Sequence, residues 1–240
     1  MKVRCSSNGK IISKSGKLTQ TGKTYLQELF TQEKRGVKKE IISKYLEKGT
    51  ATEEQGVELL NRTLYPNTFV FKNEERRENK YISGEFDVLG ADKILYDVKN
   101  AWDWLTFDKV QKLSHDYEWQ VKGYLWLWGL KKGRIFYCLN NMPEHMLDEM
   151  ERKMFYANHF ASYEDPKYLE LCEELRYKHN YDRFSDEERF KIFDIELKDE
   201  DIEKMVSCHK QAQEYYKELE SADKSRIKFN QSLINKAKQQ

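Results

Sequence analysis

The stretch ISGEFDVLGADKILYDVKN, residues 82–100, contains the pattern that decides the fold of this chain. Runs of β-branched and aromatic residues lie on both sides of a turn at 90–92, which predicts a β-hairpin. The hairpin also carries Asp87, Asp97 and Lys99, where a sheet needs only residues such as Thr or Val. Two carboxylates and a lysine at these positions need a reason beyond sheet formation.

Strand geometry indicates that the three charged side chains share one face of the hairpin. A turn over residues 90–92 places Asp87 opposite Leu95. Because side chains alternate along a strand, Asp97 and Lys99 point to the same side. Asp87 then lies on this side too, diagonal to Asp97 and about 7–8 Å from it. A two-residue turn would instead put the carboxylates on opposite faces.

Two carboxylates on one face repel each other unless a cation lies between them. Mg²⁺ suits such a position because it prefers oxygen ligands and keeps several waters, one of which can attack a phosphodiester. Lys99 would orient that water or neutralise the developing negative charge. The alternative is that Asp87 ends a strand and that Asp97 and Lys99 form an exposed ion pair. A single D-x-K triplet does not decide between these interpretations.

The segments on either side of the hairpin supply more evidence. Glu53 and Glu54 lie near the start of a predicted helix, where an acidic side chain can reach a neighbouring site. Gln120 and Tyr124 are four residues apart and therefore share one face of a later helix. Gly123 allows that helix to approach another backbone closely.

Four motifs occur in order along the chain: G-T-x-x-E at 49–53, G-x-x-D at 84–87, D-x-K at 97–99 and Q-x-x-x-Y at 120–124. This series resembles the RecB and lambda-exonuclease-like branch of the PD-(D/E)XK nuclease superfamily, especially the small enzymes of phages and mobile elements. The resemblance covers roughly residues 40–140. It implies a metal-dependent DNA nuclease, more specifically an exonuclease in recombination or DNA processing, with DNA as partner and a recombination protein as a possible second partner.

The resemblance also implies roles for individual residues. Asp87, Asp97 and the Val98 carbonyl would bind Mg²⁺ or Mn²⁺, and Lys99 would be the catalytic lysine. Glu53 stands where many relatives carry a metal-binding histidine, and the adjacent Glu54 is the alternative ligand. Gln120 and Tyr124 would brace the site or contact the DNA backbone. The expected catalytic set is thus Glu53, Asp87, Asp97, Lys99, Gln120 and Tyr124. A different interpretation keeps the fold but makes the protein a module that binds nucleic acid or a protein without cleavage.

Periodicity along the whole chain predicts an α/β (α+β) protein. Helical patterns cover 24–49, with a break at Gly36 and an end at Gly49, and then 52–65, 102–114, 117–130, 143–160, 164–179 and 198–222. Strand patterns cover 68–73, 80–90, 93–100 and 133–141, with a possible edge strand at 189–197. This order favours a small central mixed sheet flanked by helices, as in a restriction-endonuclease-like core with helical C-terminal additions.

Charge is distributed unevenly over the 240 residues. Residues 1–49 contain twelve Lys or Arg and four acids, and residues 223–240 contain five and one. Because the net charge is +1, the residues between carry 1 − 8 − 4 = −11. The expected divisions are a basic flexible segment at 1–22, a nuclease core at 23–142, a mostly helical part of the same domain at 143–222 and a basic tail at 223–240. The basic ends attract a polyanion or serve as solvated termini. Lys10, Lys14, Lys17 and Lys23 would accordingly either contact phosphates or keep the segment soluble.

The remaining features exclude several classes of protein. No apolar run is long enough to span a bilayer and the start lacks a secretory leader, so we expect a cytoplasmic protein, in a bacterial host if it is encoded by a phage. Four scattered cysteines without a C-x-x-C pair favour reduced thiols over zinc or iron–sulfur sites. We expect the histidines to be at or near the surface, and the aromatic cluster at 102–107 to pack in the core rather than stack on bases.

Overall fold

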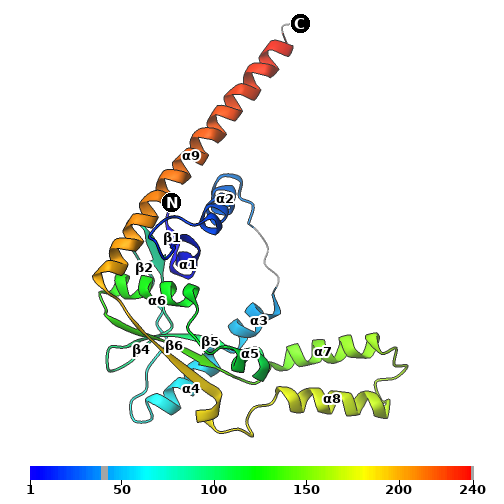
Figure 1. Cartoon of the computed structure of the whole chain (residues 1–240). Helices are drawn as coiled ribbons and strands as arrows, with labels where there is room; N and C mark the ends of the chain where they lie inside the picture. Colours follow the sequence, from blue (N-terminus) through cyan, green and yellow to red (C-terminus); the bar gives the residue numbers. More distant parts are fainter. Residues whose placement is uncertain (39–42, 239–240) are drawn as a thin grey trace.

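The structure is a computed structural model that describes residues 1–38 and 43–238. Figure 1 shows a small sheet layer with helices on both sides, a helix pair extending to one side and a long C-terminal helix. This arrangement confirms the predicted mixed α/β fold. Part of the helical pattern predicted over 24–49 lies outside the described residues.

The central sheet has four strands in the order β4-β5-β6-β7. These are β4 (Val88–Leu89), β5 (Leu95–Asn100), β6 (Lys132–Cys138) and β7 (Phe190–Glu196). β5 and β6 are parallel, whereas β4 and β7 pair antiparallel to their neighbours. β7 is an edge strand of this sheet, as the sequence predicted.

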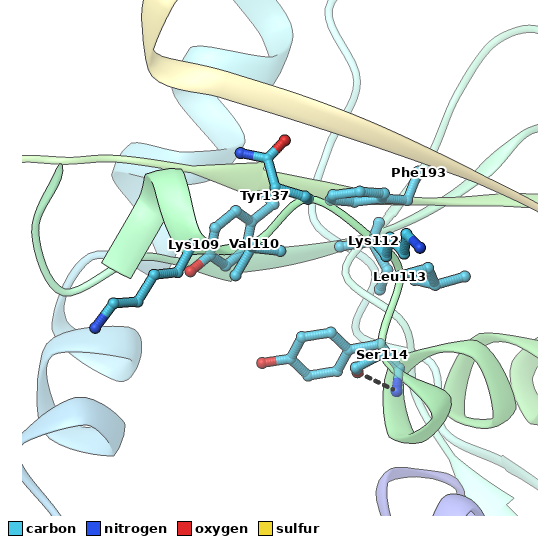
Figure 2. Close-up of a pocket in the computed structure, with 10 residues that line it drawn as sticks. Lys109, Val110, Lys112, Leu113, Ser114, Tyr137 and Phe193 are labelled. Atoms are coloured by element: carbon cyan, nitrogen blue, oxygen red, sulfur yellow. Dashed lines mark hydrogen bonds between the residues drawn. The ribbon is translucent and has the colours of Figure 1, made fainter. Parts of the chain in front are cut away.

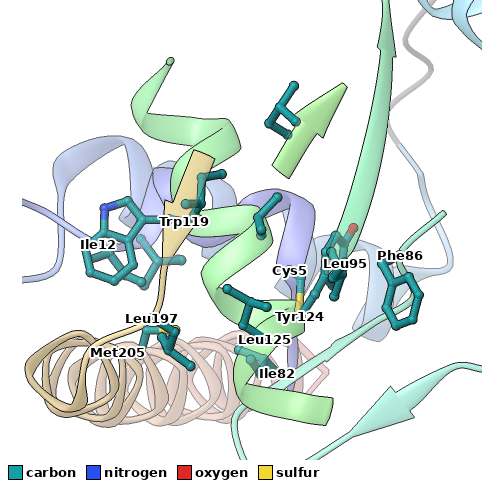
Figure 3. Packing of buried hydrophobic residues seen from close by; sticks show 14 of the residues in the cluster. Cys5, Ile12, Ile82, Phe86, Leu95, Trp119, Tyr124, Leu125, Leu197 and Met205 are labelled. Carbon is teal, nitrogen blue, oxygen red and sulfur yellow. The ribbon is translucent and has the colours of Figure 1, made fainter. Parts of the chain in front are cut away.

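Helices cover both faces of the central sheet. Successive side chains of β6 point to opposite faces, and each face packs against a different helix. Ile135 and Tyr137 belong to the large core cluster beneath α6 (His115–Trp128). Phe136 and Cys138 point to the opposite face and pack in the cluster of α4 (Glu53–Leu64). Figure 3 shows the first cluster, with Tyr124 and Leu125 of α6 close to Cys5. The sheet is therefore a buried middle layer.

A second sheet of three strands joins the N-terminus to the core. Its order is β1-β3-β2, formed by β1 (Val3–Arg4), β3 (Ile82–Gly84) and β2 (Arg77–Glu78). β1 runs parallel to β3, although about eighty residues separate them. This pairing carries the start of the chain into the centre of the molecule.

The prediction of a flexible segment at 1–22 is therefore wrong. Val3, Cys5, Ile11 and Ile12 are fully buried. A short 3₁₀ helix (Cys5–Ser7) and α1 (Asn8–Ile11) follow β1 directly. The prediction failed because these few apolar residues lie among lysines and serines, and their packing partners are distant in the sequence.

The other helices surround this core. They are α2 (Gln20–Arg35), α3 (Lys44–Ala51), α5 (Trp104–Lys109), α7 (Glu144–Ala157), α8 (Pro166–His179), a 3₁₀ helix (Asp186–Arg189) and α9 (Asp199–Ala237). α7 and α8 lie side by side and away from the sheet, and α9 runs past α2 and beyond the body (Figure 1). Residues 223–237, expected as a tail, continue this helix.

Local expectations for three segments need correction. Gly36 ends α2 as expected, with φ of 68°, but Gly49 lies inside α3. The helix predicted over 102–114 covers only Trp104–Lys109. The strand predicted at 68–73 is reduced to an isolated antiparallel bridge between Lys72 and Val88. The side chain of Asn61 binds both the N–H and the C=O of Val70, so these groups do not enter a ladder.

Buried polar residues also differ from expectation. His179 and His209 are 3% and 1% exposed, so the prediction of solvated histidines is wrong for both. His209 Nε2 lies 3.0 Å from Asn8 Oδ1, and Asn8 Nδ2 donates to the Trp119 carbonyl. This chain of bonds links α9, α1 and α6. The cysteines are unpaired, as expected.

The aromatic cluster at 102–107 packs mainly in the core, as expected. Trp104 makes edge contacts with Phe107, Tyr181 and Phe184, while Trp102 packs against Tyr45. Among the described residues, no helix combines the length and the hydrophobicity that a membrane span requires.

Candidate active site

The hairpin brings Asp87 and Asp97 together, but in a different register from the expected one. Leu89 pairs with Leu95, so the connecting loop spans residues 90–94. Continuing this register places Asp87 opposite Asp97 rather than opposite Leu95. The predicted register was wrong by two residues, and because a shift of two preserves alternation, the carboxylates still share a face.

The loop explains the difference in register. Gly90 donates to the carbonyl of Ile94, and Lys93, with φ of 63°, donates to the carbonyl of Gly90. The left-handed position of the turn is therefore occupied by a lysine. Sequence patterns favour glycine or asparagine there, so the length of this loop was not visible in the sequence.

Asp87 is held from behind by the backbone of the next strand. Its Oδ2 accepts a hydrogen bond of 2.6 Å from the N–H of Val98. Burial and the nearby charge of Asp97 raise the pKa of Asp87 to about 7, against the opposing effects of Lys99 and the Val98 N–H. An added positive charge near Asp87 would stabilise the ionised form of its carboxyl group.

Lys99 supplies the only cation in direct contact with Asp97 among the described residues. Its Nζ lies 2.6 Å from Asp97 Oδ2, which is buried and has no aligned hydrogen-bond donor. Burial by itself would lower the pKa of Lys99, but the charges of Asp97 and Asp87 raise it overall. Lys99 is thus an ammonium group at neutral pH.

α6 orients the second oxygen of Asp97. Gln120 Nε2 donates to Asp97 Oδ1 at 3.1 Å and to the Tyr124 hydroxyl at 2.9 Å. Close packing makes this possible: a Cβ on Gly84 would lie 2.6 Å from the Tyr124 ring, and one on Gly123 would lie 2.5 Å from the side chain of Asn8. Gly123 thus permits a close approach, but to the side chains of Asn8 and Cys5 rather than to another backbone as the sequence had predicted. Burial, followed by the charge of Asp97, raises the pKa of Tyr124 well above its usual value.

The two candidate glutamates occupy different environments. Both are in the first turn of α4. Glu53 lines the same cavity as Asp87 and Asp97, and its carboxylate pairs with Lys72 at 2.8 Å. Glu54 is exposed and does not line the cavity. The packing of α4 therefore places Glu53, but not Glu54, in the wall of the cavity.

One cavity of about 660 Å³ contains the whole set of candidate residues. Glu53, Asp87, Asp97, Val98, Lys99, Gln120 and Tyr124 all line it. The cavity also includes Arg4, Arg76 and Tyr117, which the sequence analysis did not propose. Arg76 stands beside Arg77 in the sequence, but Arg4 reaches the site only through the pairing of β1 with β3. These arginines provide positive charge suited to phosphate.

The oxygen ligands in the cavity suit a hard divalent cation. Asp97 is buried and Asp87 is half-buried, the two carboxylates lie opposite each other, and Asp97 Oδ2 has only Lys99 close to it. No group of three His, Cys, Asp or Glu side chains among the described residues converges on one point, since Glu53 is turned to Lys72. Mg²⁺ commonly uses one or two carboxylates, with water and substrate phosphate as its other ligands. The residues present fit that pattern.

Comparison with solved structures finds the same fold in exonucleases. A phage-related exonuclease from Haemophilus somnus 129PT is similar, with a TM-score of 0.70 and 29% identity over 92% of this chain and 96% of that chain. An alkaline exonuclease from Laribacter hongkongensis, also solved in complex with dAMP, has a TM-score of 0.63 and 16% identity over 95% and 94% of the two chains. No protein-family model and no curated protein matches the chain.

Proposed function

We propose that this protein is a metal-dependent DNA exonuclease of the PD-(D/E)XK type that acts in phage or mobile-element recombination. The observation that carries the proposal is the facing pair Asp87 and Asp97 with Lys99 beside it, in a cavity that also contains arginines. The similarity to phage-related and alkaline exonucleases over nearly the whole length of the chain supports it.

In this proposal Asp87, Asp97 and the Val98 carbonyl would hold Mg²⁺ or Mn²⁺. Glu53, which pairs with Lys72 in the structure, would be the further carboxylate available to the ion. When bound, the ion would lower the pKa of a water molecule and stabilise charge on the phosphate. Water would add to phosphorus as the bond to the leaving oxygen breaks; the attacking water gives up a proton to solvent, and the leaving oxygen takes one up from solvent. Lys99 remains protonated and neutralises charge on the phosphate oxygens.

The surrounding residues orient these groups. Gln120 fixes the carboxylate of Asp97, and Tyr124 fixes Gln120 in turn. Such supporting hydrogen bonds keep ligands in position before the metal arrives. Arg4 and Arg76 would bind the DNA backbone at the rim of the cavity.

End-labelled linear DNA and circular DNA, each incubated with the protein with and without Mn²⁺, test the proposal. We expect Mn²⁺-dependent release of nucleotides from linear DNA and no cleavage of the circle. Asp97→Asn should lower the rate by at least roughly a hundredfold while DNA binding is retained. Asp194→Asn, on the opposite face of β7, is the matched control. DNA binding without any metal-dependent cleavage would instead identify a binding module.

A further inference from the structure

A second pocket, of about 380 Å³, adjoins the acidic cavity. It lies between the sheet and the loop 110–114 that joins α5 to α6. Figure 2 shows Lys112, Leu113 and Ser114 of this loop beneath the strands that carry Tyr137 and Phe193. Its volume is within the range of pockets that bind small molecules.

The floor of this pocket continues the catalytic face of the sheet. Asp97 of β5 pairs with Ile135 of β6, which pairs with Phe193 of β7. Residues paired across strands point to the same face, so Ile135 and Phe193 lie in one row with Asp97. Strands are about 4.8 Å apart, which places this floor roughly 5–10 Å from the carboxylate-bearing strand.

Two tyrosines form walls of both cavities. Tyr117, in the first turn of α6, lines the acidic cavity and the second pocket, as does Tyr137 of β6. The Nζ of Lys99 lies 5.5 Å from the centre of the Tyr117 ring. A chain bound beside Lys99 can therefore extend directly into the second pocket.

Hydrogen bonds hold the loop of this pocket in place, and the charged side chains in its lining are both lysines. Lys191 Nζ donates to the carbonyls of Phe107 and Val110, and Ser114 Oγ accepts from the N–H of Tyr117, so both ends of the loop are fixed. Lys109 and Lys112 lie in the lining, which contains no carboxylate. Aromatic walls with lysines at the edge match a base and its phosphate.

We propose that this pocket binds an unpaired nucleobase of the DNA strand whose phosphate contacts Lys99. The inference rests on the proposed function for the position of that strand. The base stacks on the aromatic walls, and the lysines contact the neighbouring phosphate. Such a contact does not depend on base identity, because every base has a π face.

Binding measured in EDTA tests the pocket without cleavage. Leu113→Trp fills the pocket from its loop, and Leu105→Trp, at an exposed position of α5 outside the lining, is the matched control. The probes are a fluorescent twelve-nucleotide single strand and a fully abasic strand of equal length. We expect Leu113→Trp to weaken binding of the normal strand by about fivefold to tenfold and to leave the abasic strand unchanged. Unchanged binding of the normal strand, or equal weakening of both strands, overturns the proposal.

Photocrosslinking of the unmodified protein gives a second measurement that does not depend on a variant. A single strand containing 5-iodouracil should crosslink to Tyr117, Tyr137 or Phe193, identified by mass spectrometry. Crosslinks found only outside this pocket contradict the inference. Failure of the nuclease proposal is separate, since it appears as absence of Mn²⁺-dependent cleavage.

Discussion

Asp97 of β5 and Gln120 of α6 are joined by a hydrogen bond of 3.1 Å, although the two residues come from different layers of the fold. Asp97 is 2% exposed and Gln120 is 8% exposed, so water does not replace this bond easily. The bond fixes the orientation of a carboxylate whose other oxygen faces Lys99. The position of α6 on the sheet therefore determines the geometry of the candidate metal ligand.

Loss of Gln120 should affect turnover more than DNA binding. In Gln120→Ala, Asp97 loses the donor to Oδ1, and we expect kcat to fall by about 10- to 100-fold with KM for DNA little changed. Gln27→Ala, which removes an exposed glutamine from α2, should leave both constants unchanged. A rise in KM with normal kcat would show that Gln120 contacts DNA instead.

Replacement of Glu53 and of Glu54 should change the metal requirement of cleavage to different extents. Glu53 lines the acidic cavity and Glu54 does not, so Glu53→Gln should raise the Mn²⁺ concentration for half-maximal cleavage by about tenfold. Glu54→Gln should behave as the unmodified protein. Cleavage assays over a series of Mn²⁺ concentrations measure both. The reverse order would assign the ligand role to Glu54.

The N-terminal segment should contribute to stability as core rather than as tail. Ile11 is fully buried, so Ile11→Ala should lower the free energy of unfolding by about 2–5 kcal/mol. Lys14→Ala, at an exposed position nearby, should change it by less than about 0.5 kcal/mol. Urea denaturation followed by circular dichroism measures the difference. Equal stability of the two variants would restore the interpretation as a flexible segment.

Burial of His209 should make stability depend on pH below neutrality. Burial lowers the pKa of His209 from 6.5 to about 4, so the folded protein holds it neutral. The unfolded chain binds a proton first as pH falls, and the associated stability is complete above 6.5 and decreases as pH drops toward 4. The loss amounts to about 3 kcal/mol in total.

Urea denaturation at pH 7, 6, 5 and 4 measures this contribution. We expect His209→Gln to lose less stability on acidification than the unmodified protein, since it lacks the titrating group. His145→Gln, at an exposed position, should keep the original pH profile. Parallel profiles for the unmodified protein and His209→Gln would exclude the effect.

Much of the fold could be read from local patterns. The alternation in β6 and the helical spacing in α4, α6, α7 and α8 were visible because each depends on neighbours within a few residues. The strand expected at 68–73 is reduced to an isolated bridge between Lys72 and Val88, because the side chain of Asn61, from α4, takes both backbone bonds of Val70. Competition of this kind has no signature within the segment itself.

The sequence by itself determined which chemical groups are present. It also determined that Asp87, Asp97 and Lys99 share a face, because a register shift of two residues leaves every side chain of a hairpin on the same face. Only the tertiary structure decided the register, which depends on a left-handed lysine in the loop, and which of the two glutamates enters the cavity. It also brought Arg4 to the site through a strand pairing across the chain. These features arise from contacts between distant residues, whose free energy exists only once the layers have packed.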